Sequence, residues 1–301
     1  MSVLPVLIWT SASDFQSRLG ERLEGDYELI ATRTFEETRA QLERGRPAIL
    51  FVGPEDLAQY GEDLTQTSYR LYPDLPVALI ESTSSANCFW LLQMYGLSAA
   101  IPRSLSFSRR HLKVFFDHLT TPLPGFSIEP YFPQGQNITR RRVTDLSMRD
   151  EILNDLISSF AGCPYVSSHD LQLIFEEIFN NVVFHAFRTR STEARNAGEA
   201  LDEPLKPDEE VFLEWTTGEE AGALAITDNQ GLLSRQDVWD RFFRQTSLTG
   251  LLDIDGRGLF LAHLLSRQVV VTIAPGRRTQ IAVFFSPDPP ENEKLISVRV
   301  V

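Results

Sequence analysis

Residues 177–186 read Glu-Ile-Phe-Asn-Asn-Val-Val-Phe-His-Ala, and this stretch decides how the second half of the chain folds. Glu177, Asn181 and His185 recur every four residues, so a helix over 169–187 stacks them one turn apart on a single face. The apolar residues around them form a second stripe that faces the core. A polar stripe is also typical of a solvated helix face, so its meaning depends on the motifs that accompany it.

Three later motifs combine strand ends, turns and a helix start. Asp228 ends an apolar run and precedes a turn at Gly231. An Asp there can accept a hydrogen bond from an exocyclic adenine amine while glycine lets the backbone approach the ring. Gly256 and Gly258 open a helix, where backbone N–H groups can point at phosphate oxygens. Residues 276–279 predict a turn that leads into a strand.

These motifs follow one another in the order found in the GHKL superfamily of ATP-binding domains, which residues 138–286 resemble. The helix at 177–181 resembles the family's N-box, and residues 256–261 resemble its G2 box. The sequence Gly-Leu-Phe-Leu at 258–261, together with His-Ala at 185–186, particularly resembles that of the anti-sigma-factor serine kinases. The resemblance implies an α+β sandwich for this half of the chain.

The resemblance also implies roles for single residues in an ATP and Mg²⁺ site. Glu177 would be the catalytic residue that acts on a serine hydroxyl, and Asn181 would give an oxygen to Mg²⁺. Asp228 would meet the adenine, whereas His185 is expected to be structural. The residues implied in nucleotide binding are Asn181, Asp228, Gly231, Gly256, Arg257, Gly258 and Thr279.

The stretch 233–254 stands where the family has its ATP lid. It contains Arg235, Arg241 and Arg244, any of which could reach a γ-phosphate as a charged donor. The helical pattern Val238–Phe243 is equally consistent with a partner-binding element.

Residues 1–120 alternate short apolar runs with helical patterns, which predicts a doubly wound parallel sheet resembling the response-regulator receiver domain. A receiver needs an acceptor Asp after its third strand, but Gly53 follows 48–52 here. Pro102 and Arg103 occupy the place of the Lys-Pro pair. Without a carboxylate there is neither nucleophile nor metal ligand, so we expect a pseudo-receiver that serves docking or dimerisation.

The predicted organisation is therefore a pseudo-receiver at 1–120, a proline-rich linker at 121–137, and the GHKL-like domain at 138–301. In the second domain we expect helices on one face of a mixed sheet, with Ser168 as the N-cap of the long helix. Strands are expected at 138–143, 211–215, 223–227, 269–273 and 280–285.

The composition narrows the functional classes. Lys and Arg total 28 against 41 Asp and Glu, for a net charge of −13, which disfavours nucleic acid or an anionic membrane as the main partner. Two cysteines far apart in sequence form no disulfide framework, and the chain starts without a signal-like segment. We expect a cytoplasmic protein, and analogy with receivers suggests a homodimer formed through 101–119.

Two functions remain open. The first is a serine/threonine kinase that uses ATP and Mg²⁺ and acts on an anti-anti-sigma-like partner. The second is a binding module that sequesters a sigma-like or other regulator without transferring phosphate. The second is favoured by Gln230 and Leu232, which stand where the family has glycines, and by the missing acceptor in the first half. A sensor histidine kinase is disfavoured because 121–145 is too short and proline-rich for a phosphoacceptor helical hairpin.

Overall fold

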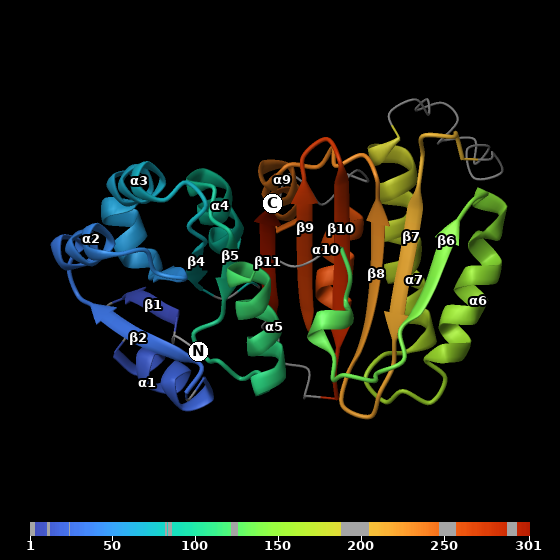
Figure 1. Ribbon diagram of the computed structural model, residues 1–301, viewed down its shortest axis with the longest axis horizontal. Helices are drawn as coiled ribbons and strands as arrows, with labels where there is room; N and C mark the ends of the chain where they lie inside the picture. The colour runs from blue at the N-terminus through green and yellow to red at the C-terminus, as the bar shows by residue number, and fades with distance from the viewer. Residues whose placement is uncertain are drawn as a thin grey trace. The chain divides into compact units, whose positions relative to one another are not determined.

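The computed structural model describes residues 4–10, 13–23, 25–81, 83, 86–121, 126–187, 205–246, 257–287 and 294–301. Two compact units share these residues (Figure 1). The first comprises Met1–Pro122 with Glu291–Arg299, and the second comprises Leu123–Pro290 with Val300–Val301.

The first unit contains a parallel sheet in the order β2-β1-β3-β4-β5. This order is that of flavodoxin-like folds, in which the order of strand addition reverses between β1 and β3. The predicted doubly wound parallel sheet is confirmed. The strands are β1 Leu4–Trp9, β2 Tyr27–Thr32, β3 Ile49–Val52, β4 Val77–Ile80 and β5 Ala99–Ile101.

Helices cover both faces of this sheet (Figure 1). Phe15 and Leu19 from one helix and Phe115 and Phe116 from another share a core with one face of the strands. Side-chain caps at Thr34 and Ser108 fix where two of the helices begin, because each oxygen accepts an N–H that lacks an intrahelical partner. The helices are α1 Ser13–Arg22, α2 Phe35–Arg44, α3 Pro54–Leu71, α4 Ala86–Tyr95 and α5 Arg109–Thr120.

A sixth strand of this sheet comes from the far end of the sequence. The strand β11, Leu295–Val300, pairs antiparallel with β5, with Ile296 opposite Ala100. The backbone N–H of Val298 donates to the Ser98 carbonyl at 2.7 Å. Residues 291–299 therefore belong to the first unit, which differs from the expected single domain at 138–301. Sequence order alone could not reveal this pairing.

The second unit has a sheet in the order β9-β10-β8-β7-β6, and every ladder in it is antiparallel. The expectation of a mixed sheet was wrong, because short turns join β7 to β8 and β9 to β10 as hairpins. The strands are β6 Thr139–Val143, β7 Val211–Thr216, β8 Gly222–Asp228, β9 Gln268–Ala274 and β10 Arg278–Phe285.

The helices of the second unit pack on one face of its sheet, and α7 and α10 lie behind the strands in Figure 1. On this face the Trp215 indole N–H donates to the Ser159 hydroxyl at 3.1 Å. The N-cap of α7 is Ser167 and not Ser168, because the Ser167 hydroxyl accepts the Asp170 N–H. The helices are α6 Arg149–Ser159, α7 Ser168–Asn181, α9 Arg235–Thr246 and α10 Arg257–Leu265, with short turns η1 Glu129–Tyr131 and η2 Leu146–Met148 and a π-helical turn η3 Val182–Ala186.

Part of the expected linker is packed against the second unit. Tyr131 and Phe132 both contact the Phe284 ring, at centroid distances of 5.5 Å and 6.2 Å. The Glu214 carboxylate accepts the Ile128 N–H at 2.9 Å, which ties this segment to β7. In Figure 1 the segment crosses in front of β10. Residues 126–137 therefore behave as part of the second unit and not as a free linker.

Within the described ranges, no helix is both long enough and apolar enough to cross a membrane.

His118 gives the first unit a pH-dependent stability. Its ring is fully buried on α5, and Nδ1 hydrogen bonds with the Ser297 hydroxyl of β11 at 2.8 Å. Burial, helped by the positive charge of Arg299, lowers the pKa of His118 to about 3. The pKa is thus depressed below that of the unfolded chain, so the neutral ring stabilises the fold above about pH 6.5.

We therefore expect this stabilisation to fall as pH drops from about 6.5 toward 3, by up to about 1.4 kcal/mol per pH unit. In His118→Asn, an uncharged residue that can still hydrogen bond with Ser297, that part of the pH dependence should be missing. Urea unfolding of both proteins at several pH values measures the difference. Equal slopes for the two proteins would contradict the assignment.

Candidate functional site

The residues of the N-box-like stripe meet the start of α10. Glu177 and Asn181 are half-buried and lie one turn apart on α7. A Cβ atom placed on Gly258 would lie 2.6 Å from Glu177 Oε2 and 2.7 Å from Asn181 Nδ2. Only glycine permits this approach, since real Cβ atoms do not come so close to other heavy atoms. The structure therefore brings Glu177, Asn181 and Gly258 together.

The electrostatics at this point favour negative charge. Gly258 lies in the first turn of α10, where unpaired backbone N–H groups carry the positive end of the helix dipole. A phosphate placed there would be stabilised by the helix dipole. Arg257 opens the helix with an exposed side chain, whereas Gly256 lies outside the described residues.

Asn181 has a cationic neighbour from α9. The Arg241 guanidinium donates to Asn181 Oδ1 at 3.4 Å. Of the three arginines in the expected lid, Arg244 is instead exposed and pairs with Asp240 on its own helix at 2.8 Å. The described part of the lid is thus a helix, Arg235–Thr246, that presents one arginine to the N-box-like stripe.

Asp228 lies where β8 ends and is almost fully buried. Its Oδ1 accepts the backbone N–H groups of Gln230 at 2.8 Å and of Gly231 at 2.9 Å. Burial raises the pKa of the Asp228 carboxyl, while the Gly231 and Gln230 N–H groups and Thr279 act to lower it. Oδ1 is therefore committed to the turn, so a ligand amine would have to use Oδ2.

Thr279 stands directly across the ladder from Asp228, on the same face of the sheet. Its hydroxyl is buried and makes no hydrogen bond of normal geometry with the described residues, although it is near enough to lower the pKa of Asp228. A buried hydroxyl in this state has hydrogen-bonding capacity left for a ligand or a water. Asp228, Gly231 and Thr279 thus form a second group, on β8, its turn and β10.

The backbone of the turn after β8 requires a glycine at position 231. Its φ of +60° is left-handed, and a Cβ there would lie 2.2 Å from the Ala274 carbonyl oxygen. The Gly276 N–H donates to the Gly231 carbonyl at 3.1 Å, so the turn after β8 is locked onto the β9–β10 hairpin. The space beside Gly231 in the Cβ direction is filled by backbone and not by a ligand-sized opening.

The side-chain oxygens of this site could hold a metal ion only together with further oxygens from a bound ligand. No group of three or more His, Cys, Asp and Glu side chains comes together within the described ranges. Mg²⁺ in phosphate-binding sites commonly uses one or two protein oxygens together with phosphates and waters. The residues present therefore fit Mg²⁺ carried by a nucleotide better than a protein-only metal site. The side chain of His185 lies outside the described residues.

The carboxyl ends of the parallel strands in the first unit hold a compact polar group. A Cβ on Gly53 would lie 2.9 Å from both Asp56 Oδ2 and Thr10 Oγ1. Glu55 pairs with Arg103 at 3.6 Å. The place of an acceptor carboxylate is thus taken up by neighbouring side chains.

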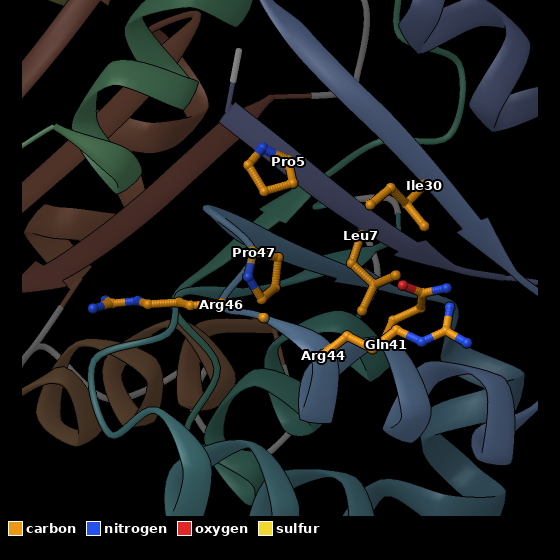
Figure 2. A pocket seen from close by; sticks show the side chains of 8 residues that line it. Pro5, Leu7, Ile30, Gln41, Arg44, Arg46 and Pro47 are labelled. Atoms are coloured by element: carbon orange, nitrogen blue, oxygen red, sulfur yellow. The ribbon is translucent and has the colours of Figure 1, made fainter. Parts of the chain in front are cut away.

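A small hollow of about 200 Å³ lies elsewhere on the first unit, between α2 and the strands (Figure 2). Leu7 and Ile30 form its floor, and Arg44 and Arg46 lie at its margin. It is at the amino ends of β1 and β3, whereas ligands of doubly wound sheets bind beyond the carboxyl ends. The hollow therefore has no counterpart among the sites that this fold class uses.

Sequence reasoning missed a cavity of about 480 Å³ on the helix-free face of the second sheet. The guanidinium groups of Arg142 and Arg278 both lie over the Phe212 ring, 5.8 Å and 6.0 Å from its centroid. Arg142 is also paired with Glu210 at 2.6 Å. The alternation of Arg140 and Arg142 along β6 was the signal, because alternate residues of a strand share a face.

No protein-family model matches the chain, and no curated protein matches it. Among solved structures, a response regulator receiver modulated diguanylate cyclase from Pelobacter carbinolicus is similar at 15% identity and a TM-score of 0.30. That match covers 39% of this chain and 92% of the other. A pilus assembly-related protein from Burkholderia pseudomallei is similar at 14% identity and a TM-score of 0.32, covering 42% of this chain and 95% of the other.

Two glycines, Gly231 after β8 and Gly276 between β9 and β10, allow a matched test of packing. Gly231 and Gly276 both have positive φ, but a Cβ on Gly276 meets nothing within 4 Å. Gly276→Ala should cost about 1 kcal/mol of left-handed strain, whereas Gly231→Ala should cost about 3 kcal/mol because it also strikes the hairpin backbone. Chemical denaturation of both variants measures the difference, and equal losses would show that the turn is not locked as described.

Proposed function

We propose that the second unit binds ATP with Mg²⁺ and that the protein is a signalling regulator of the GHKL, anti-sigma-kinase-like type. The observation that carries the proposal is the meeting of Glu177, Asn181 and Gly258 from two helices far apart in sequence. A carboxylate, an amide oxygen and a glycine at a helix start are the groups that such a site uses. The helices that cover one face of the second sheet support the proposal, since the resemblance implies an α+β sandwich.

In this proposal each residue has a defined task. The first turn of α10 would hold the phosphates, and Asn181 would give its Oδ1 to the Mg²⁺ that neutralises them. Asp228 Oδ2 and the Thr279 hydroxyl receive the adenine side. Glu177 would accept the proton of a serine hydroxyl on an anti-anti-sigma-like partner. The serine oxygen would then form the new bond to the γ-phosphorus as the bond between that phosphorus and ADP breaks.

A second candidate is a non-catalytic module that sequesters a sigma-like or other regulator. The observation that favours it is the turn after β8, in which Gly231 is packed against the Ala274 carbonyl. The turn thereby lacks the open glycines that let a backbone lie against an adenine ring. In both proposed functions the first unit serves as a surface for protein contacts. Gly53 stands where a receiver has its phosphate-accepting Asp, so we assign no phosphoryl transfer to this unit. Neither candidate requires nucleic acid or a membrane.

Nucleotide binding is tested by thermal unfolding with and without Mg-ATP. At a hundredfold excess over Kd the melting temperature should rise by about 5 °C, and Asn181→Ala should abolish the shift. Asn180→Ala is the matched control because it changes the same side chain one position away on α7 and should keep the shift. An unchanged melting temperature of the native chain at millimolar Mg-ATP would refute the proposal.

Glu177→Gln separates the kinase from the binding module. The variant keeps the size of the side chain but cannot accept a proton, so it should retain the Mg-ATP shift and lose transfer to serine by about 100-fold. The measurement is label transfer from γ-labelled ATP to a candidate anti-anti-sigma-like protein. Binding without transfer in the native chain favours the module, and transfer that survives the substitution removes Glu177 from its role.

A further inference from the structure

The Asn181 amide has a definite orientation between two neighbours. Its Nδ2 lies on the side of Gly258 and the Glu177 carboxylate, 2.7 Å from the point where a Gly258 Cβ would be. Its Oδ1 lies on the opposite side of the amide and accepts from Arg241 at 3.4 Å. This orientation places the amide oxygen, which can only accept hydrogen bonds, beside a cation.

The oxygen that faces Arg241 is the only atom of the Asn181 side chain that can ligate a metal ion. The Arg241 guanidinium lies beside that oxygen, where Mg²⁺ would have to approach. It is also a permanent cation. Two cations at one oxygen repel each other, and the arginine must move before the metal ion can bind.

From this geometry we propose that Arg241 is a latch on the metal position: it holds Asn181 Oδ1 in the nucleotide-free protein and is released when the nucleotide phosphates arrive. The inference rests on the proposed function and adds a regulatory step to it. Arg241 is a positioning residue in this scheme, since it acts through Asn181.

The packing of α9 shows which part would move. Phe242, the next residue, is buried and lies against Phe260 and His263 of α10, with centroid distances of 6.1 Å and 5.3 Å. Trp239 is buried on the same helix. These contacts hold α9 in place, so release requires a change of the Arg241 side chain and not of the helix.

The incoming phosphates supply the reason for release. A charge-assisted hydrogen bond from guanidinium to phosphate is stronger than one to a neutral amide oxygen. Mg²⁺ alone brings only a further positive charge and so gives the arginine no new partner. The latch therefore makes metal binding depend on the nucleotide, and it weakens the contribution that Mg²⁺ makes to nucleotide affinity in the native chain.

The test compares the affinity for ATP in EDTA with the affinity for Mg-ATP by calorimetry, using the full chain. The ratio of the two dissociation constants measures how much Mg²⁺ contributes. In Arg241→Ala this ratio should rise about tenfold over the native value, because ATP bound in EDTA loses the guanidinium that is released to its phosphates, whereas in Mg-ATP the metal ion still neutralises them. Arg241→Gln keeps a polar, helix-favouring residue and should also raise the ratio.

Arg244→Ala is the control, since Arg244 is on the same helix but pairs with Asp240. It should leave the ratio unchanged. An Arg241 variant that weakens both affinities equally, or lowers the ratio, would overturn the latch while leaving ATP binding intact. A native chain that binds neither form of ATP would instead refute the proposed function, and the latch with it.

Discussion

The candidate site depends on one close approach, that of the α10 backbone to two side chains of α7. A side chain of any size at Gly258 would collide with Glu177 and Asn181. With glycine there, the first turn of α10 brings its unpaired N–H groups up to a carboxylate and an amide. The dipole of α10 then favours negative charge at the same place. A phosphate bound at this helix start would lie beside Glu177 and Asn181.

Asp228 illustrates the balance between structural and binding roles. Two backbone N–H groups bind one of its oxygens, which fixes the turn, and burial keeps the carboxyl in a setting where its pKa is raised. A carboxylate held in this way is rigid and dry, and both properties suit recognition of an amine. The closed packing at Gly231 limits the approach of a ring from one side. The two proposed functions differ in whether an adenine ring can still reach Asp228 from the side that Gly231 does not close.

Short-range patterns were enough to predict much of the fold. The alternation of apolar runs and helical patterns predicted the parallel sheet of the first unit, and the four-residue spacing of Glu177 and Asn181 predicted their shared helix face. The antiparallel order of the second sheet and the pairing of β11 with β5 depend on contacts between distant segments. The period-two pattern Ile296-Ser297-Val298-Arg299-Val300 signals a strand but not its partner. The orientation of the Asn181 amide likewise depends on Arg241, a neighbour that spacing alone does not identify.

Gly53 removes the phosphate-accepting side chain that a receiver has after its third strand. In a doubly wound sheet the carboxyl ends of the strands are the usual place for reactive groups. Here Asp56 and Thr10 fill the space beside Gly53, and Arg103 is paired with Glu55. The position that holds the acceptor residue in a receiver is thus a glycine, and the side chains beside it are packed together, which favours the expected role of this unit in docking. The exposed side chains of Trp90 and Met94, one turn apart on α4, are the sort of apolar surface that such a role needs.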